Sequence, residues 1–163
     1  MEYPKRKQNR LPDYDYSQTG CYHVTICAKD NHNLFSIISP GNPFTPAEPK
    51  LTNSGIIVEK YIKGIDNTYS YITIDKYVIM PNHVHLLIAI HDHDKKHSAR
   101  ANEIIPFLVS TLKRLSNKEA GIAMWQRGYF DHVIRNTPDY LTVWQYIDDN
   151  PAKWIYDDYY IRG

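Results

Sequence analysis

The sequence has few cysteines, no long hydrophobic run and no excess of charge of either sign. Cys21 and Cys27 fall in one apparent strand, where six residues at about 3.3 Å each separate them by ~20 Å, too far for a disulfide. They form no CxxC motif, so we expect buried free thiols and no zinc site built on thiolates. No apolar run approaches the ~20 residues of a membrane-spanning helix. Because the polar start also lacks an export signal, we expect a cytoplasmic protein that does not bind membranes.

Bulk charge does not identify a partner. The 163 residues carry 19 lysines and arginines against 18 acidic residues, a net charge of +1, which neither requires nor excludes nucleic acid. At 42% hydrophobic residues, the length predicts one domain with one core. We therefore expect a single domain over 1–163, with an irregular N-terminal arm over 1–20 and a proline-rich loop over 39–50.

Apolar patterning predicts a mixed fold. Residues that favour β-structure predict strands over 21–28, 71–79, 83–90 and 129–135. Apolar residues at helical spacing predict helices over 51–66 and from 104 to 115, and a third helix begins at Thr137-Pro138-Asp139 and ends before Pro151. This order matches a ferredoxin-like α+β domain with one helix added. We expect an antiparallel sheet with two helices on one face and the last helix on the other.

Two histidines of the strand over 83–90 are candidates for chemistry. Because side chains alternate along a strand, His83 and His85 share one face, about 7 Å apart at Cα, and the apolar side chains between them point the other way. Two imidazoles at this spacing could share a divalent ion. The same pattern also occurs on ordinary solvent-facing strands, so the pair needs support from elsewhere.

The last predicted helix provides that support. Tyr146 and Asn150 are four residues apart and project from the same helix face. Asn150 would add an oxygen as third ligand, and a mixed nitrogen and oxygen set with open positions suits Mg²⁺ or Mn²⁺. Tyr146 would be the nucleophile; a phenol with a pKa of about 10 needs a metal-polarised phosphate to act as one.

Three sequence blocks resemble a known family. Residues 80–87 (MPNHVHLL) resemble the HUH motif, histidine–apolar–histidine, of single-tyrosine transposases. Residues 125–136 (WQRGYFDHVIRN) are similar to the segment after the basic helix of REP-associated tyrosine transposases. Residues 146–154 (YIDDNPAKW) resemble that group's closing motif, YIxxNPxKW. The blocks follow the family's order and spacing, and the similarity runs from about Tyr22 to Tyr160.

The resemblance implies an endonuclease and strand transferase for single-stranded DNA. By matching position, His83, His85 and Asn150 are metal ligands, and Tyr146 forms a 5′-phosphotyrosine link that leaves a free 3′-hydroxyl. The implied substrate is DNA with a hairpin formed by a palindromic repeat, and the implied cofactor is Mg²⁺ or Mn²⁺. Both monomers and homodimers that exchange their tyrosine helices are compatible with the sequence.

Other residues compete for roles. Tyr129 is a second candidate nucleophile, but only Tyr146 has a ligand partner one helical turn away. The histidine-rich loop over 91–97 is more typical of a solvated surface than of a second metal site. Candidates for DNA contacts, each of which could equally be structural, are Lys113, Arg127, His132 and Arg135.

Two other functions remain open on the sequence. The first is a non-catalytic nucleic-acid-binding module, because this topology also serves proteins that stack bases on a sheet. The second is a metal-dependent phosphodiesterase that uses water as its nucleophile. Neither would depend on Tyr146 for catalysis.

Overall fold

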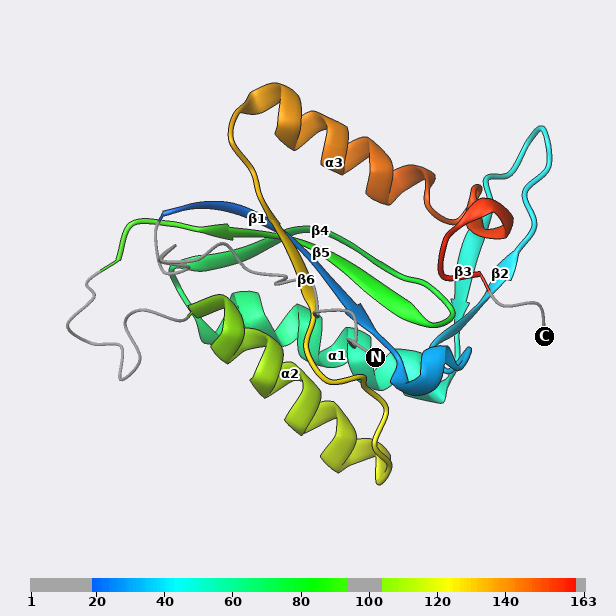
Figure 1. The fold of residues 1–163 in the computed structure, drawn as a ribbon, viewed down its shortest axis with the longest axis horizontal. Helices are drawn as coiled ribbons and strands as arrows, with labels where there is room; N and C mark the ends of the chain where they lie inside the picture. The colour runs from blue at the N-terminus through cyan, green and yellow to red at the C-terminus, as the bar shows by residue number, and fades with distance from the viewer. Residues whose placement is uncertain (1–18, 94–103, 161–163) are drawn as a thin grey trace, which may run out of the picture.

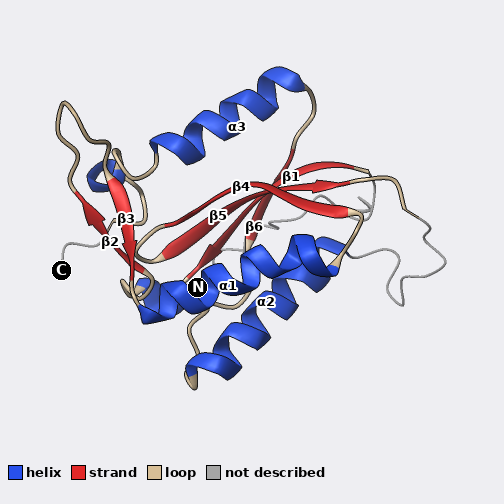
Figure 2. Ribbon diagram, turned by 180° about the vertical axis from the view of Figure 1, so that it is seen from behind, coloured by secondary structure: helices blue, strands red, loops and turns tan. Residues whose placement is uncertain are grey.

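One antiparallel sheet organises the molecule in the computed structural model, which describes residues 19–93 and 104–160. Its strand order is β4-β5-β1-β6. The strands are β1 (Gly20–Cys27), β4 (Ile72–Ile79), β5 (His83–Ile90) and β6 (Phe130–Val133). Helices α1 (Asn53–Thr68) and α2 (Ile104–Ala120) cover one face, and α3 (Thr137–Asp149) crosses the other (Figures 1 and 2). The predicted α+β architecture is thereby confirmed.

The main core lies between the sheet and the two helices. The apolar side chains of α1 that point inward are Val58, Ile62 and Ile65, at the helical spacing seen in the sequence. They meet the face of β5 that carries Val84 and Leu86. All eight residues of β5 are buried, because the strand is central in the sheet and both its faces are covered.

A second, smaller core fixes α3 on the opposite face. Val143 and Ile147 of α3 pack with Met80, Leu87 and Trp154 in this cluster. On this face of the sheet, the apolar cluster that holds α3 therefore lies beside the polar residues.

Polar contacts add a direct tie from α3 to the edge strand β4. Lys76 Nζ lies 2.5 Å from Asp148 Oδ1 and 4.4 Å from the ring centre of Trp144. Tyr140 Oη donates to Asp75 Oδ2 at 2.8 Å. Asp75 sits at an irregularity in the β4–β5 register, which interrupts the regular pairing beside the residues that hold α3.

The proline-rich segment differs from the prediction of a loop. Residues Ser36–Ser39 (β2) and Glu48–Leu51 (β3) pair as a small antiparallel sheet, with Ile38 opposite Pro49. The expectation that four prolines exclude regular structure over 39–50 is therefore wrong at residue 39 and at residues 48–50. In a two-stranded sheet each strand has one unpaired side, so a proline can be accepted without losing a ladder hydrogen bond.

The remaining features agree with the sequence or lie outside the described residues. Cys21 and Cys27 are free thiols. Short 3₁₀ turns follow β1 at Lys29–Asn31 and α3 at Trp154–Tyr156. Within 19–93 and 104–160 no helix is long and apolar enough to cross a membrane. Nearly all of the predicted arm, and the histidine-rich loop from residue 94 on, lie outside these ranges.

Candidate active site

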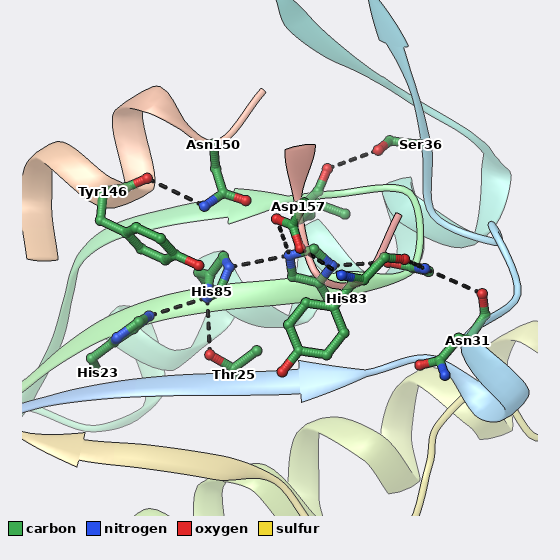
Figure 3. Close-up of polar contacts among 12 residues, drawn as sticks. His23, Thr25, Asn31, Ser36, His83, His85, Tyr146, Asn150 and Asp157 are labelled. Carbon is green, nitrogen blue, oxygen red and sulfur yellow. Dashed lines mark hydrogen bonds and ion pairs between the residues drawn. The ribbon is translucent and has the colours of Figure 1, made fainter. Parts of the chain in front are cut away.

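The two histidines of β5 meet beneath α3. Both are buried, with exposures of 0% for His83 and 2% for His85, and their Nε2 atoms are 3.1 Å apart (Figure 3). The rings are nearly perpendicular, at 81°. The alternation predicted from the sequence therefore brings two imidazole nitrogens to one point.

Asn82 determines which nitrogen of His83 carries the proton. The Asn82 amide group donates to the carbonyl oxygens of Tyr159 at 2.6 Å and of Asn31 at 3.2 Å. Its Oδ1 must then face His83 Nδ1, 2.9 Å away. Because an amide oxygen only accepts hydrogen bonds, Nδ1 is the donor and Nε2 of the neutral ring presents a lone pair.

His85 is held from the neighbouring strand β1. Its Nδ1 lies 2.9 Å from Thr25 Oγ1 and 3.1 Å from His23 Nε2 (Figure 3). Burial lowers the pKa of His23 to about 4, an effect increased by the nearby His132 and opposed by Asp139. Burial also lowers the pKa of His85, so both rings are neutral near pH 7.

Asn150 contributes an amide oxygen that has no hydrogen-bond partner among the described residues. The residue is 3% exposed at the end of α3, and its Nδ2 donates to Tyr146 O at 3.3 Å. Its buried Oδ1 is unpaired. Leaving such an acceptor unsatisfied costs about 1–3 kcal/mol, and a cation is one group that would satisfy it.

Tyr146 lies beside the histidines and is open to solvent. Its ring centre is 5.2 Å from that of His85 and 5.9 Å from that of His23, both edge-on. The side chain is 46% exposed. The helix thus presents a phenol at the mouth of the site, where a substrate could reach it.

Asp157 is a site residue that sequence reasoning missed. Its Oδ2 lies 3.7 Å from His83 Nε2, and its side chain is only 8% exposed. Burial raises the pKa of Asp157, while burial lowers the pKa of His83 to about 4 and the Asn150 side chain opposes that change. Asp157 comes after α3, and no periodicity in the sequence places that segment against β5.

The donor set fits one small divalent ion. In the ranges 19–93 and 104–160 no group of three or more histidine, cysteine, aspartate or glutamate side chains could hold a metal. A cation here would rest on the lone pairs of His83 and His85 Nε2 and on Asn150 Oδ1. Imidazole and amide oxygen are ligands that Mn²⁺ accepts.

The other predicted residues divide between two sides of the sheet. Tyr129 is 8% exposed and belongs to the core beneath α1 and α2, whereas Tyr146 faces the histidines. Lys113 Nζ donates to the carbonyl oxygens of Gln126 and Gly128, at 2.7 and 2.5 Å, and so braces the loop before β6. Arg127 is exposed in that loop.

His132 lies on the strand beside β1, and Arg135 follows the same strand. His132 pairs with His23 across β1 and β6, and its Nε2 is 2.9 Å from both carboxylate oxygens of Asp139. The Arg135 side chain is exposed. Roles for these two residues in DNA binding stay predictions, as they do for Lys113 and Arg127.

Known proteins resemble this chain in sequence and in structure. No family model matches. An uncharacterized protein of Haemophilus influenzae is 29% identical over 174 residues, covering 96% of this chain and 93% of its own length. A REP-associated tyrosine transposase of Escherichia coli is 32% identical over 85 residues, 50% of this chain and 47% of that protein. The resemblance to the REP-associated tyrosine transposases is confirmed.

A solved structure shares the fold. It is a REP-associated tyrosine transposase bound to a REP hairpin, with a TM-score of 0.64 and 20% identity over 89% of this chain and 73% of that chain. The sequence match to the Escherichia coli transposase spans about half the length of that relative. The comparisons thus establish the fold of this chain and identify its relatives. Its activity depends on the chemistry of the site described above.

Proposed function

We propose that this protein is a metal-dependent endonuclease and strand transferase for single-stranded DNA, with Tyr146 as its nucleophile. The observation that carries the proposal is the convergence of four groups from two elements. The Nε2 atoms of His83 and His85 are 3.1 Å apart, and α3 brings the unpaired Asn150 Oδ1 and the exposed Tyr146 ring to the same face of the sheet. The relatives named transposases support this chemistry.

The division of labour follows from the residue types. His83, His85 and Asn150 would hold a divalent ion, which when bound polarises a phosphate oxygen and offsets the charge that develops there. Tyr146 Oη loses its proton and bonds to phosphorus while the bond from phosphorus to the 3′-oxygen breaks. The 3′-oxygen takes up a proton, which leaves a free 3′-hydroxyl and a 5′-phosphotyrosine. Because the new ester retains the bond energy, the hydroxyl of another end can reverse the step without a nucleotide cofactor.

The proposed substrate is DNA that combines a hairpin with an unpaired flank. The structural neighbour was solved with a REP hairpin, which supports the hairpin. An unpaired flank is expected because Tyr146 lies on an open face, where a single strand can bring its phosphate to the phenol.

A denaturing gel tests the proposal. The wild-type protein, Mn²⁺ and end-labelled hairpin DNA with a single-stranded flank should give a labelled band at the mass of the protein plus DNA. Tyr146→Phe should remove this band. Tyr156→Phe, which changes another exposed tyrosine (81% exposed), should retain it.

The two other functions give different gels. A water-using phosphodiesterase would release a nicked strand without a covalent band, and Tyr146→Phe would cut equally well while His83→Ala would not. A binding module would shift the DNA in a native gel and cut nothing. Either result would exclude the proposed chemistry.

A further inference from the structure

His23 of β1 contacts both the candidate ligand His85 and the candidate nucleophile Tyr146, which also contact each other. Its Nε2 is 3.1 Å from His85 Nδ1, and the two ring centres are 5.1 Å apart. Its ring also meets the Tyr146 ring at 67°, with 5.9 Å between the ring centres. None of the three sequence blocks that resemble the transposases includes this residue.

We propose that His23 is a positioning residue that fixes the tautomer and the ring orientation of His85. To offer a lone pair at Nε2, a neutral His85 must carry its proton on Nδ1, and that N–H needs an acceptor. The two polar atoms recorded at that nitrogen are Thr25 Oγ1 and His23 Nε2. This inference rests on the proposed function for the identity of the cation, but not for the hydrogen bonds themselves.

The two acceptors are not equivalent. A threonine hydroxyl both donates and accepts, so alone it could donate to Nδ1 and leave the proton on Nε2, where it would block a metal. A neutral His23 that carries its proton on Nδ1 presents at Nε2 a lone pair that can only accept. In this tautomer His23 selects the form of His85 that binds metal, and Thr25, directly opposite His85 in the β1–β5 register, supplies the second contact.

The same ring bounds the position of the phenol. His85 and His23 both contact the Tyr146 ring at steep angles, 76° and 67°. A smaller or differently shaped side chain at position 23 would loosen the ligand and the nucleophile together. His23 thus couples metal geometry on β5 to the helix that carries Tyr146.

Calorimetric titration of the full chain with Mn²⁺, without DNA, tests the inference. His23→Leu should weaken Mn²⁺ binding by about 10- to 100-fold, the range found when the partner of a metal-bound histidine is removed. His23→Gln, whose amide oxygen can accept from Nδ1, should recover most of the affinity. His32→Ala, which removes an exposed histidine of the surface, is the matched control and should bind as the wild type does.

The tautomer gives a second measurement that a purely structural role would not change. Nitrogen NMR of the protein loaded with diamagnetic Mg²⁺ should show His85 and His23 each protonated on Nδ1 in the wild type and His85 protonated on Nδ1 in His23→Gln, whereas His23→Leu should need more Mg²⁺ to reach that state. Circular dichroism and the melting temperature establish that each variant is folded. If His23→Leu does not fold, His23→Gln and the wild type still decide the matter through the His23 and His85 signals.

The outcomes separate this inference from the proposed function. Wild-type Mn²⁺ affinity in folded His23→Leu, or a His23 protonated on Nε2 in the Mg²⁺-loaded wild type, would overturn the positioning role and leave the strand-transfer proposal standing. Tight, His23-dependent Mn²⁺ binding with no covalent DNA adduct would overturn the strand-transfer proposal instead. Tyr146→Phe should retain full Mn²⁺ affinity in either case.

Discussion

Asn150 is the residue in which stability and function make opposite demands. Its buried Oδ1 has no partner in the described part of the chain, so the folded protein gains nothing from that atom. Asn150→Ala should change the free energy of unfolding by less than about 1 kcal/mol, since the lost Nδ2 bond and the removed orphan oxygen offset each other. It should nevertheless weaken Mn²⁺ binding at least about tenfold.

Urea denaturation and Mn²⁺ titration of the same variant check both halves of this expectation. Asn150→Asp supplies the control, because it keeps an oxygen at this position and adds a negative charge, and should bind Mn²⁺ at least as well as the wild type. Wild-type affinity in Asn150→Ala would remove Asn150 from the ligand set.

Two glycines of α1 should respond in opposite ways to alanine. A Cβ at Gly55 would lie 2.0 Å from the carbonyl oxygen of Phe35, whereas a Cβ at Gly64 meets nothing within 4 Å. Gly55→Ala should destabilise the fold by more than about 2 kcal/mol, because backbone must move. Gly64→Ala should stabilise it by about 0.5–1 kcal/mol through helix propensity. Chemical denaturation measures both, and equal effects would contradict the packing described at Phe35.

At the residue scale, local spacing was enough for part of the site. The strand period placed His83 and His85 on one face, and the helix period paired Tyr146 with Asn150. His23 and Thr25 could not be found in this way, because their contact with His85 depends on the register of β1 against β5. No short-range pattern encodes a pairing between segments so far apart in the sequence.

At the element scale, the attachment of α3 to β4 determines where Tyr146 stands. Lys76→Met keeps the aliphatic stem but removes the contacts of the ammonium group with Asp148 and Trp144. It should lower the free energy of unfolding by about 1 kcal/mol, because the pair is partly screened by solvent. The rate of backbone amide hydrogen exchange within α3 should be higher in Lys76→Met than in the wild type.

Lys63→Met is the matched comparison for this helix attachment. Lys63 pairs with Glu59 on the surface of α1, with 62% of its side chain exposed, and should change stability by less than about 0.5 kcal/mol. Unchanged exchange in α3 of Lys76→Met would show that the apolar cluster alone holds the helix.

Asp139, in the first turn of α3, should make the stability of the fold depend on pH in the acidic range. Hydrogen bonds from His132 and from the Arg135 backbone lower the pKa of Asp139 below its ordinary value of 3.8. A carboxylate of this kind stabilises the fold above its unfolded pKa, and the contribution is lost as the pH falls through the folded pKa. The difference in melting temperature between the wild type and Asp139→Asn should therefore shrink below about pH 4.

Thermal unfolding from about pH 6 to about pH 2.5 measures this difference. A melting difference for Asp139→Asn that stays constant with pH would show that the carboxylate charge plays no part.

Among elements, the long ones and the short strand β6 were predictable, and the short strands β2 and β3 were not. α1 and β5 have sustained periodic patterns, and both were expected within a few residues of their observed bounds. β2 and β3 have four residues each, and β3 includes Pro49, so their pairing depends on tertiary context and not on local preference. The position of residues 154–160 against His83 likewise depends on tertiary context and not on local preference.

At the scale of the whole molecule, the site is complete within one chain. α3 is bound to β4 of its own sheet, and Tyr146 lies 5.2 Å from His85 of the same chain, measured between ring centres. A mixture of His85→Ala and Tyr146→Phe should therefore form no covalent DNA adduct. A denaturing gel of the mixed variants reads this out, and a labelled band would demonstrate exchange of helices between two copies.

The strand order has a consequence for synthesis of the chain. β1 is an inner strand, but its neighbours β5 and β6 both come much later in the sequence. When only β1 and α1 have been synthesised, β1 has no neighbouring strand to pair with on either side. Because these distant segments pair late, folding is slow, and the unpaired edges of the strand stay exposed to pairing with other chains. Nascent fragments that stop before Phe130 should thus depend on chaperones, and the face that carries the candidate active site would be the last part of the molecule to assemble.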